Sequence, residues 1–177
     1  MLTHQYKFAN HSGWVGISHC GVFKNEESGD WFYTSQGRLP ENTGGNAYSN
    51  AIMMGHVNKI SWTEDGWPVV MPERYAAVPQ DTIVKSDLVG SWEVINMKYE
   101  YRKQQTSVPL VLKEDGTATG GLTGQWSYDG AKKILTIGAQ KLCVERELDW
   151  EANPRVPTIV FSGLTVSGTP VWGKQNK

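Results

Sequence analysis

His19 and Cys20 are adjacent in the run Gly16-Ile-Ser-His-Cys-Gly-Val-Phe23, and both side-chain types bind metals in proteins. Neighbouring residues on a β-strand point to opposite faces of a sheet, so we do not expect this pair to share one zinc ion. A lone histidine is more often an ordinary core or surface residue than a ligand. The remaining histidines have no spacing that sets them apart: His4, His11 and His56.

Four acidic residues are candidates for acid–base chemistry, but each lies in or beside an expected turn: Asp30, Glu41, Asp65 and Glu73. Acidic side chains in turns usually accept local hydrogen bonds. For these four residues we therefore favour local hydrogen bonding in a turn over a catalytic role.

The segment 35–75 is rich in glycine and asparagine and is flanked by aromatic residues, a composition suited to lining a sugar-binding cleft. Within it, Asn42, Asn46 and Tyr48 could donate and accept hydrogen bonds with sugar hydroxyls. Trp14 lies in a glycine-flanked stretch and could stack on a sugar ring, although packing against a neighbouring sheet explains it equally well. Together these residues form the predicted substrate-binding set.

Strand patterns dominate the elements that must position these residues, because 19 glycines and 8 prolines interrupt the few helical windows. Residues 84–177 contain about seven short strands at regular spacing, which predicts a small antiparallel barrel or sandwich. Residues 1–83 contain fewer strands and a long loop, and residues 76–87 resemble a linker. We expect two all-β units, and the first is too small to bury its sheet edges alone.

Composition excludes several classes of partner. The 17 basic and 18 acidic residues are interspersed, so no electrostatic surface for nucleic acid or a membrane is expected. No apolar run approaches the ~20 residues of a membrane-spanning helix, and residues 1–13 lack the pattern of a secretory signal. The spacing of Cys20 and Cys143 favours two free thiols but leaves a disulfide open.

Longer motifs resemble a known family along essentially the whole chain. One group of motifs resembles the last blade of the five-bladed propeller of glycoside hydrolase family 43, in particular the bacterial endo-α-1,5-L-arabinanases: residues 16–23, 35–42 and 65–75. Another group resembles the lipocalin-like β-barrel that follows that propeller: residues 88–92, the Asp115-Gly116 hairpin and residues 171–174. The resemblance implies the closing part of a propeller catalytic domain at 1–83 and a C-terminal barrel at 84–177.

The resemblance also implies a function. These arabinanases cut arabinan by inversion, with an acid and a base ~6.5–9.5 Å apart. All the catalytic carboxylates lie in earlier blades. The histidine that corresponds to His19 helps to hold a metal, usually calcium, in the propeller channel. We therefore expect a secreted arabinan-degrading hydrolase with arabinan or arabino-oligosaccharide as substrate. The missing blades would form a partner, as part of the same enzyme or as a separate chain, and this chain alone is expected to be inactive.

Two other readings stay open. The chain could be a non-catalytic carbohydrate-binding module, because residues 85–177 look complete enough to fold alone. Alternatively, the second unit could be a structural cap that covers an edge of the propeller. The sequence does not separate endo from exo action, and it leaves the identity of the metal open.

Overall fold

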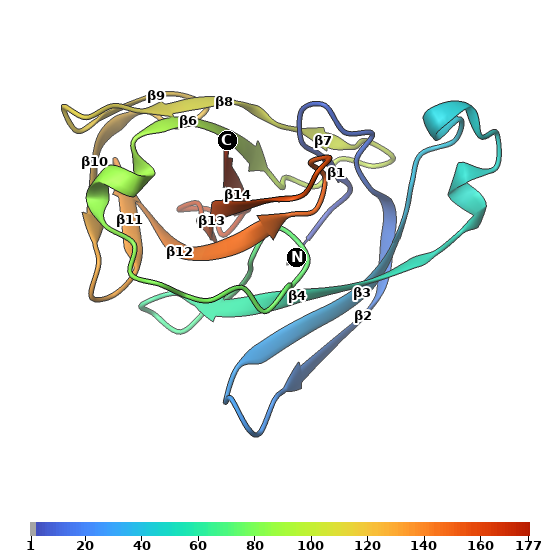
Figure 1. Cartoon of the computed structure of the whole chain (residues 1–177), viewed down its shortest axis with the longest axis horizontal. Coiled ribbons are helices and arrows are strands. Elements are labelled where there is room, and N and C mark those ends of the chain that lie inside the picture. Colours follow the sequence, from blue (N-terminus) through green and yellow to red (C-terminus); the bar gives the residue numbers. More distant parts are fainter. Residues whose placement is uncertain (1–2) are drawn as a thin grey trace.

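The computed structural model describes residues 3–177 and is all-β, as predicted from the sequence. It consists of a closed barrel and a curled four-stranded sheet, joined by a chain segment without strands (Figure 1). The helical pieces in the described chain are three short 3₁₀ turns: η1 (Thr43–Gly45), η2 (Ser49–Ala51) and η3 (Lys85–Leu88). Across residues 3–177, no helix is long and apolar enough to cross a membrane.

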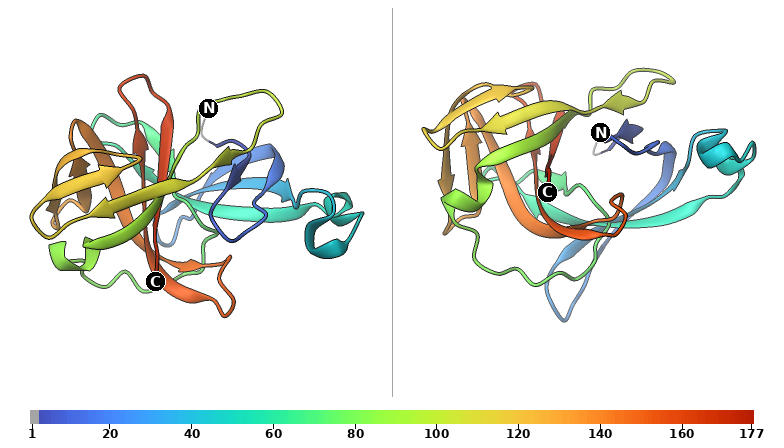
Figure 2. Two further views of the ribbon diagram at one scale, coloured as in Figure 1. Left: turned by 90° about the horizontal axis from the view of Figure 1, so that it is seen from above. Right: turned by 45° about the horizontal axis from the view of Figure 1, so that its top comes forward.

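The curled sheet is antiparallel and runs in chain order: β2 (Val15–Lys24), β3 (Trp31–Arg38), β4 (Met54–Trp62) and β5 (Pro68–Val70). The β2–β3 connection is the expected hairpin, in which the Asn25 side chain accepts hydrogen bonds from the backbone of Glu27 and Ser28. The β4–β5 connection is the expected Asp65-Gly66 turn, and Gly66 adopts a φ of 84° that suits glycine. A long loop carrying η1 and η2 joins β3 to β4 and projects from one end of the sheet (Figure 2).

The barrel closes in the order β10-β11-β12-β13-β14-β6-β8-β9, so it has eight strands where the sequence suggested about seven. Its strands are β6 (Gly90–Asn96), β8 (Val108–Leu112), β9 (Thr117–Gly120), β10 (Gly124–Asp129), β11 (Ile134–Ile137), β12 (Gln140–Asp149), β13 (Val156–Leu164) and β14 (Pro170–Gln175). The sequence analysis missed β9, a four-residue strand rich in threonine and glycine.

The barrel interior is filled by side chains that alternate inward along the strands. Trp92, Leu110, Leu135 and Phe161 are among its fully buried members. On β14, Gly173 pairs with Phe161, and a Cβ at this glycine would overlap the phenyl ring. Alternate residues such as Trp172 point outward, into a second cluster shared with the sheet.

The sheet packs against the outside of the barrel through two apolar clusters. Val70 of β5 packs with Ile95 and Trp172 from the outer face of the barrel, while Val69 packs with Val160 in a third cluster. The N-terminal strand β1 (Tyr6–Lys7) also pairs in parallel with β7 (Gln105–Thr106), an extension beside the barrel. The two predicted units are therefore bound together by buried contacts.

The predicted linker at 76–87 lacks strands, as expected, but it is fixed to the barrel wall. Gln80 and Arg146 exchange hydrogen bonds, the Arg146 guanidinium donates to the carbonyls of Asp81 and Thr82, and Ile83 is buried in the barrel core. This segment holds the two units in place instead of letting them move apart.

The contact between Gly173 and Phe161 gives a first testable prediction. Gly173→Ala should lower the free energy of unfolding by about 1–3 kcal/mol, because the added methyl overpacks a filled interior. Gly55→Ala is the matched control, since a Cβ there meets no atom within 4 Å and its φ is not positive. Urea unfolding of both variants makes the comparison, and equal stability of the two would contradict the packing argument.

Candidate functional site

His19 lies in the middle of β2, at a break in the regular pairing of that strand. The register between β2 and β3 shifts between Val15 and Ser18 and again between Ser18 and Gly21. His19 has a φ of 53°, in the left-handed region that non-glycine residues rarely adopt, and it is exposed. Bulges of this kind redirect a side chain at the edge of a sheet.

The hydrogen bonds around Ser18 determine which ring nitrogen of His19 is free. Ser18 Oγ donates its single proton to the Gly16 carbonyl at 3.1 Å and accepts from Gln36 Nε2 at 3.0 Å. Its remaining contact, with His19 Nδ1 at 3.1 Å, must therefore be one in which Nδ1–H donates. In the neutral ring, this leaves the lone pair on Nε2 directed away from Ser18. A ring held through one nitrogen with the other free is the usual arrangement of a metal-binding histidine.

Cys20 is engaged elsewhere. Its Sγ lies 2.7 Å from the hydroxyl of Tyr33 on the neighbouring strand, whereas His19 contacts Ser18. Both cysteines are free thiols, which excludes a disulfide between Cys20 and Cys143 in this structure.

The predicted sugar-contacting residues are carried by the loop between β3 and β4. Asn42 is exposed and left-handed, with a φ of 58°, and the Asn46 side chain accepts a hydrogen bond from the Tyr48 backbone at 2.9 Å. The Tyr48 side chain is 78% exposed. This loop leaves the sheet at the end where Arg38 pairs with Val15, so it begins near the half of β2 that carries His19.

Trp14 is buried, with only 4% of its surface exposed. Its ring meets the edge of His56 at a centroid distance of 4.4 Å, and the Arg74 guanidinium lies 5.3 Å from its centroid. Burial, together with the positive charge of Arg74, lowers the pKa of His56 to about 4. Packing is the role that this conformation shows for Trp14, and stacking on a sugar stays a prediction.

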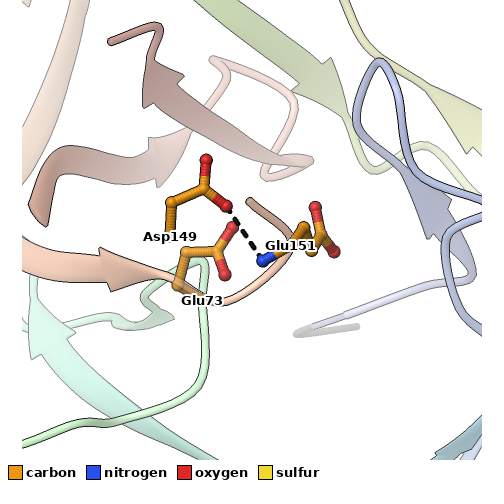
Figure 3. A group of neighbouring side chains, drawn as sticks. All are labelled: Glu73, Asp149 and Glu151. Atoms are coloured by element: carbon orange, nitrogen blue, oxygen red, sulfur yellow. Dashed lines mark hydrogen bonds between the residues drawn. The ribbon is translucent and has the colours of Figure 1, made fainter. Parts of the chain in front are cut away.

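The sequence analysis missed a cluster of charged residues where the sheet meets the barrel. Glu73, Asp149 and Glu151 each place an oxygen within 4.8 Å of the others (Figure 3). Lys174 of β14 lies among them, with its ammonium 2.9 Å from Glu73, 3.0 Å from Asp149 and 3.1 Å from Glu151. The lysine therefore places a positive charge among three clustered carboxyl groups.

Glu73 was assigned to local turn bonding from the sequence, and that assignment was wrong. Its side chain is buried, its φ is 66°, and its carboxylate accepts a hydrogen bond from the Trp150 backbone on the barrel. Burial and the neighbouring Glu151 charge raise the pKa of Glu73 to about 8, against the opposing effect of Lys174. No local sequence signal marks this residue, because its partners are more than 70 positions away.

The other three acidic residues also find partners. Asp65 accepts from the Thr63 hydroxyl within its turn, and Glu41 accepts from Asn50 within the loop. Asp30 instead lies 3.2 Å from the Lys59 ammonium, which also approaches Glu145 of the barrel. Asp30 and Glu145 therefore share the Lys59 ammonium as their counter-ion.

With the barrel and the exposed His19 described, comparison with known proteins becomes informative. Residues 72–173, more than half of the chain, match the family model of the glycoside hydrolase family 43 (GH43) C-terminal lipocalin-like domain. The chain belongs to this family. The match covers the barrel together with the segment that contains Glu73.

Relatives extend the similarity to the sheet. The chain is 24% identical over 166 residues to the extracellular endo-α-(1→5)-L-arabinanase 2 of Bacillus subtilis, covering 93% of this chain and 34% of that protein. A solved GH43 protein, YxiA of Bacillus licheniformis, superposes with a TM-score of 0.81 at 27% identity, over 98% of this chain and 38% of that one. The endo-1,5-α-L-arabinanase of Thermotoga petrophila shares the fold with a TM-score of 0.82 at 22% identity, over 99% of this chain and 40% of that chain. The chain thus spans well under half the length of each of these relatives.

The raised pKa of Glu73 gives the prediction for this site. In the folded protein Glu73 keeps its proton up to about pH 8, whereas the unfolded chain loses it near pH 4.5. The contribution of Glu73 to the free energy of unfolding is therefore fully present below about pH 4.5, and it is lost as the pH rises through 8. In the Glu73→Gln variant, the free energy of unfolding should therefore decline less with rising pH.

Urea unfolding over a series of pH values measures this slope. Burial also raises the pKa of Glu147, to about 7, so the decline above pH 7 reports mainly on Glu73. Glu26→Gln is the matched control, because that side chain is 85% exposed. Identical slopes for Glu73→Gln and the unmodified protein would show that Glu73 is ionised throughout.

Proposed function

We propose that this chain is the C-terminal part of a GH43 enzyme that cleaves α-1,5-linked L-arabinan by inversion. It supplies the closing blade of a propeller (1–83), a histidine that binds the channel metal, and the C-terminal barrel (84–177), while the catalytic carboxylates come from the preceding blades. The open outer edge of β2, next to His19, is the observation that carries the proposal.

Within residues 3–177, β2 pairs with β3 on one side only. An edge strand of ten residues leaves a row of backbone donors and acceptors that favours association with other chain segments. Large apolar side chains of this edge strand are also exposed: Val22 at 54% and Phe23 at 45%. Packed blades of a propeller would cover such a surface. The partner is therefore the earlier part of the propeller, in the same polypeptide or as a separate chain.

The metal proposed for His19 is calcium. The free Nε2 lone pair fits a metal ligand, and Ser18 orients the ring. Calcium prefers oxygen ligands, so one imidazole would act together with waters and groups from other blades. A bound ion in a propeller channel would hold the blades in register and contribute fixed positive charge beneath the substrate.

Asn42, Asn46 and Tyr48 are proposed to contact arabinan or arabino-oligosaccharide from the β3–β4 loop. Their exposure, and the start of the loop near the His19 half of β2, support this. The whole enzyme is proposed to be secreted, as is the extracellular relative from Bacillus subtilis.

A second candidate function is a non-catalytic, carbohydrate-binding module. The closed barrel favours it, because the barrel has no unpaired edge and a complete core. The filled interior would restrict binding to the outer surface, in contrast to barrels that enclose a ligand.

The first functional prediction concerns activity. Residues 1–177 alone should release no sugar from linear arabinan. A chimera in which they replace the corresponding C-terminal part of the Bacillus subtilis arabinanase should be folded and active. Reducing-sugar release measures both proteins. Turnover by residues 1–177 alone, or an inactive chimera that is folded, would contradict the proposal.

A second prediction concerns metal binding in the same chimera. Ser18→Ala should weaken calcium binding about 10- to 100-fold, because the imidazole loses the partner that orients Nε2. His19→Ala should remove the contribution of the imidazole to calcium affinity. Ser28→Ala, in the distant β2–β3 turn, is the control and should bind calcium as the unmodified chimera does. Calcium titration by calorimetry gives the affinities. Unchanged binding in both His19→Ala and Ser18→Ala would rule out His19 as a ligand.

A further inference from the structure

A groove lies where the β4–β5 turn meets the barrel, at the opposite end of the sheet from His19. We call it the junction groove. Its walls come from the β4–β5 turn, from β11 and β12, and from the β13–β14 turn, and its volume is about 970 Å³. Gly55, near the His19 end, and Thr63, in the groove just after β4, are eight positions apart, a span of about 26 Å at 3.3 Å per residue.

Trp67 and Val166 face this groove from opposite turns and are unusually exposed. Trp67 is 61% exposed and Val166 is 94% exposed, although both are large and apolar. Within the described part of the chain, the Trp67 indole nitrogen donates to no protein acceptor. An aromatic ring with one apolar face and a free N–H is suited to a ligand that is partly apolar and partly hydroxylated.

The two turns that carry these side chains have the same hydrogen-bond scheme. In the β4–β5 turn, the Gly66 amide donates to the Thr63 carbonyl at 2.9 Å, and the Trp67 amide donates to the Thr63 hydroxyl at 2.9 Å. In the β13–β14 turn, the Gly168 amide donates to the Thr165 carbonyl at 2.8 Å, and the Thr169 amide donates to the Thr165 hydroxyl at 3.0 Å. Both walls are therefore preformed.

An ion-pair bridge fixes one wall against the other. Glu64 of the β4–β5 turn accepts hydrogen bonds from Lys132 and Lys141 of the barrel, with 2.9 Å to Lys132. Asp65 accepts from the Thr63 hydroxyl at 2.7 Å. The Lys141 ammonium in the groove therefore has Glu64 as its counter-ion, whereas Asp65 has only a hydroxyl partner, so the described lining of the groove offers no unpaired cation to an anionic ligand.

We propose that the junction groove binds a segment of a neutral polysaccharide chain, with Trp67 stacking on a sugar ring. The volume is within the usual range of ~300–1,000 Å³ for ligand sites. The hydroxyls of Thr165 and Ser167 stand at the rim beside Val166, 2.9 Å apart, and can exchange hydrogen bonds with the sugar. Because the lysine of the groove is already paired with Glu64 and the Asp65 carboxylate is not neutralised, an uncharged chain is favoured over an anionic one.

The identity of the sugar as α-1,5-linked arabinan rests on the proposed function. The distance from His19 places the groove outside the cleavage site of that proposal. A second contact on one long polymer raises the effective concentration of the substrate without taking part in the reaction. The groove would therefore matter for polymeric arabinan and not for short oligosaccharides.

Affinity electrophoresis of the full chain, in gels that contain linear arabinan, tests the inference. The unmodified chain should be retarded. Trp67→Ala should lower the affinity about tenfold, the loss expected when one stacking contact is removed. Val166→Glu should also reduce it, because a charge then enters the opposite wall. Tyr101→Ala is the matched control, since Tyr101 is an aromatic residue 73% exposed outside the groove.

Each outcome separates the inference from the proposed function. Retardation that Trp67→Ala and Val166→Glu weaken, with Tyr101→Ala unchanged, supports the groove. Absence of retardation, or equal retardation of all variants, overturns the inference, while an active chimera would still support the enzyme. Retardation only in gels of polygalacturonate, an anionic polymer, would overturn the neutral-ligand assignment. Circular dichroism of each variant verifies that the fold is intact.

Discussion

The packing of β5 against the outside of the barrel is the constraint on which the rest of the structure depends. Val69 and Val70 point to opposite faces of the sheet, and each is buried in a different cluster with outward-facing barrel residues. Burial of both side chains contributes on the order of 3–6 kcal/mol. Because β5 is then covered on both faces, the sheet is anchored at this edge and can leave its other edge, β2, open.

Lys174 adds directional, charged contacts to that apolar one. Its ammonium lies 4.4 Å from the Phe8 ring centroid and among three acidic side chains: Asp149 at the end of β12, Glu151 from the β12–β13 connection, and Glu73 from the segment after β5. A buried ion pair gains little net stability, because removing the charges from water offsets their attraction. Its effect is on geometry: the contact between Glu73 and Lys174 joins the segment after β5 to β14. The three-carboxylate group is thus explained without a metal ion.

The sequence predicted what is local. Alternating patterns located nearly all barrel strands, and Asp-Gly or Asn-rich turns located the hairpins, because these features depend on neighbouring residues. Closure of the barrel by β9, the docking of residues 76–87 and the role of Glu73 were not predictable in this way. The docking of residues 76–87 and the role of Glu73 depend on partners far away in the sequence: Arg146 for Gln80, and Lys174 for Glu73. Strand β9 instead pairs with its chain neighbours β8 and β10, and it was missed because its Thr-Ala-Thr-Gly sequence contains no large apolar residue. The tautomer of His19 was likewise not predictable, because it follows from the hydrogen bonds that Ser18 forms with Gly16, with Gln36 and with His19 itself.

The filled barrel also determines where this family member can meet a ligand. Trp92 and Phe161 stack within the interior at a centroid distance of 5.3 Å, and Gly173 provides the space that the phenyl ring occupies. A barrel whose interior is filled by side chains in this way is a rigid support for its outer surface. Surfaces made by both units remain, at the open β2 edge and at the junction groove. Because both surfaces need the sheet fixed against the barrel, the buried contacts of β5 and Lys174 are a condition for binding at either place.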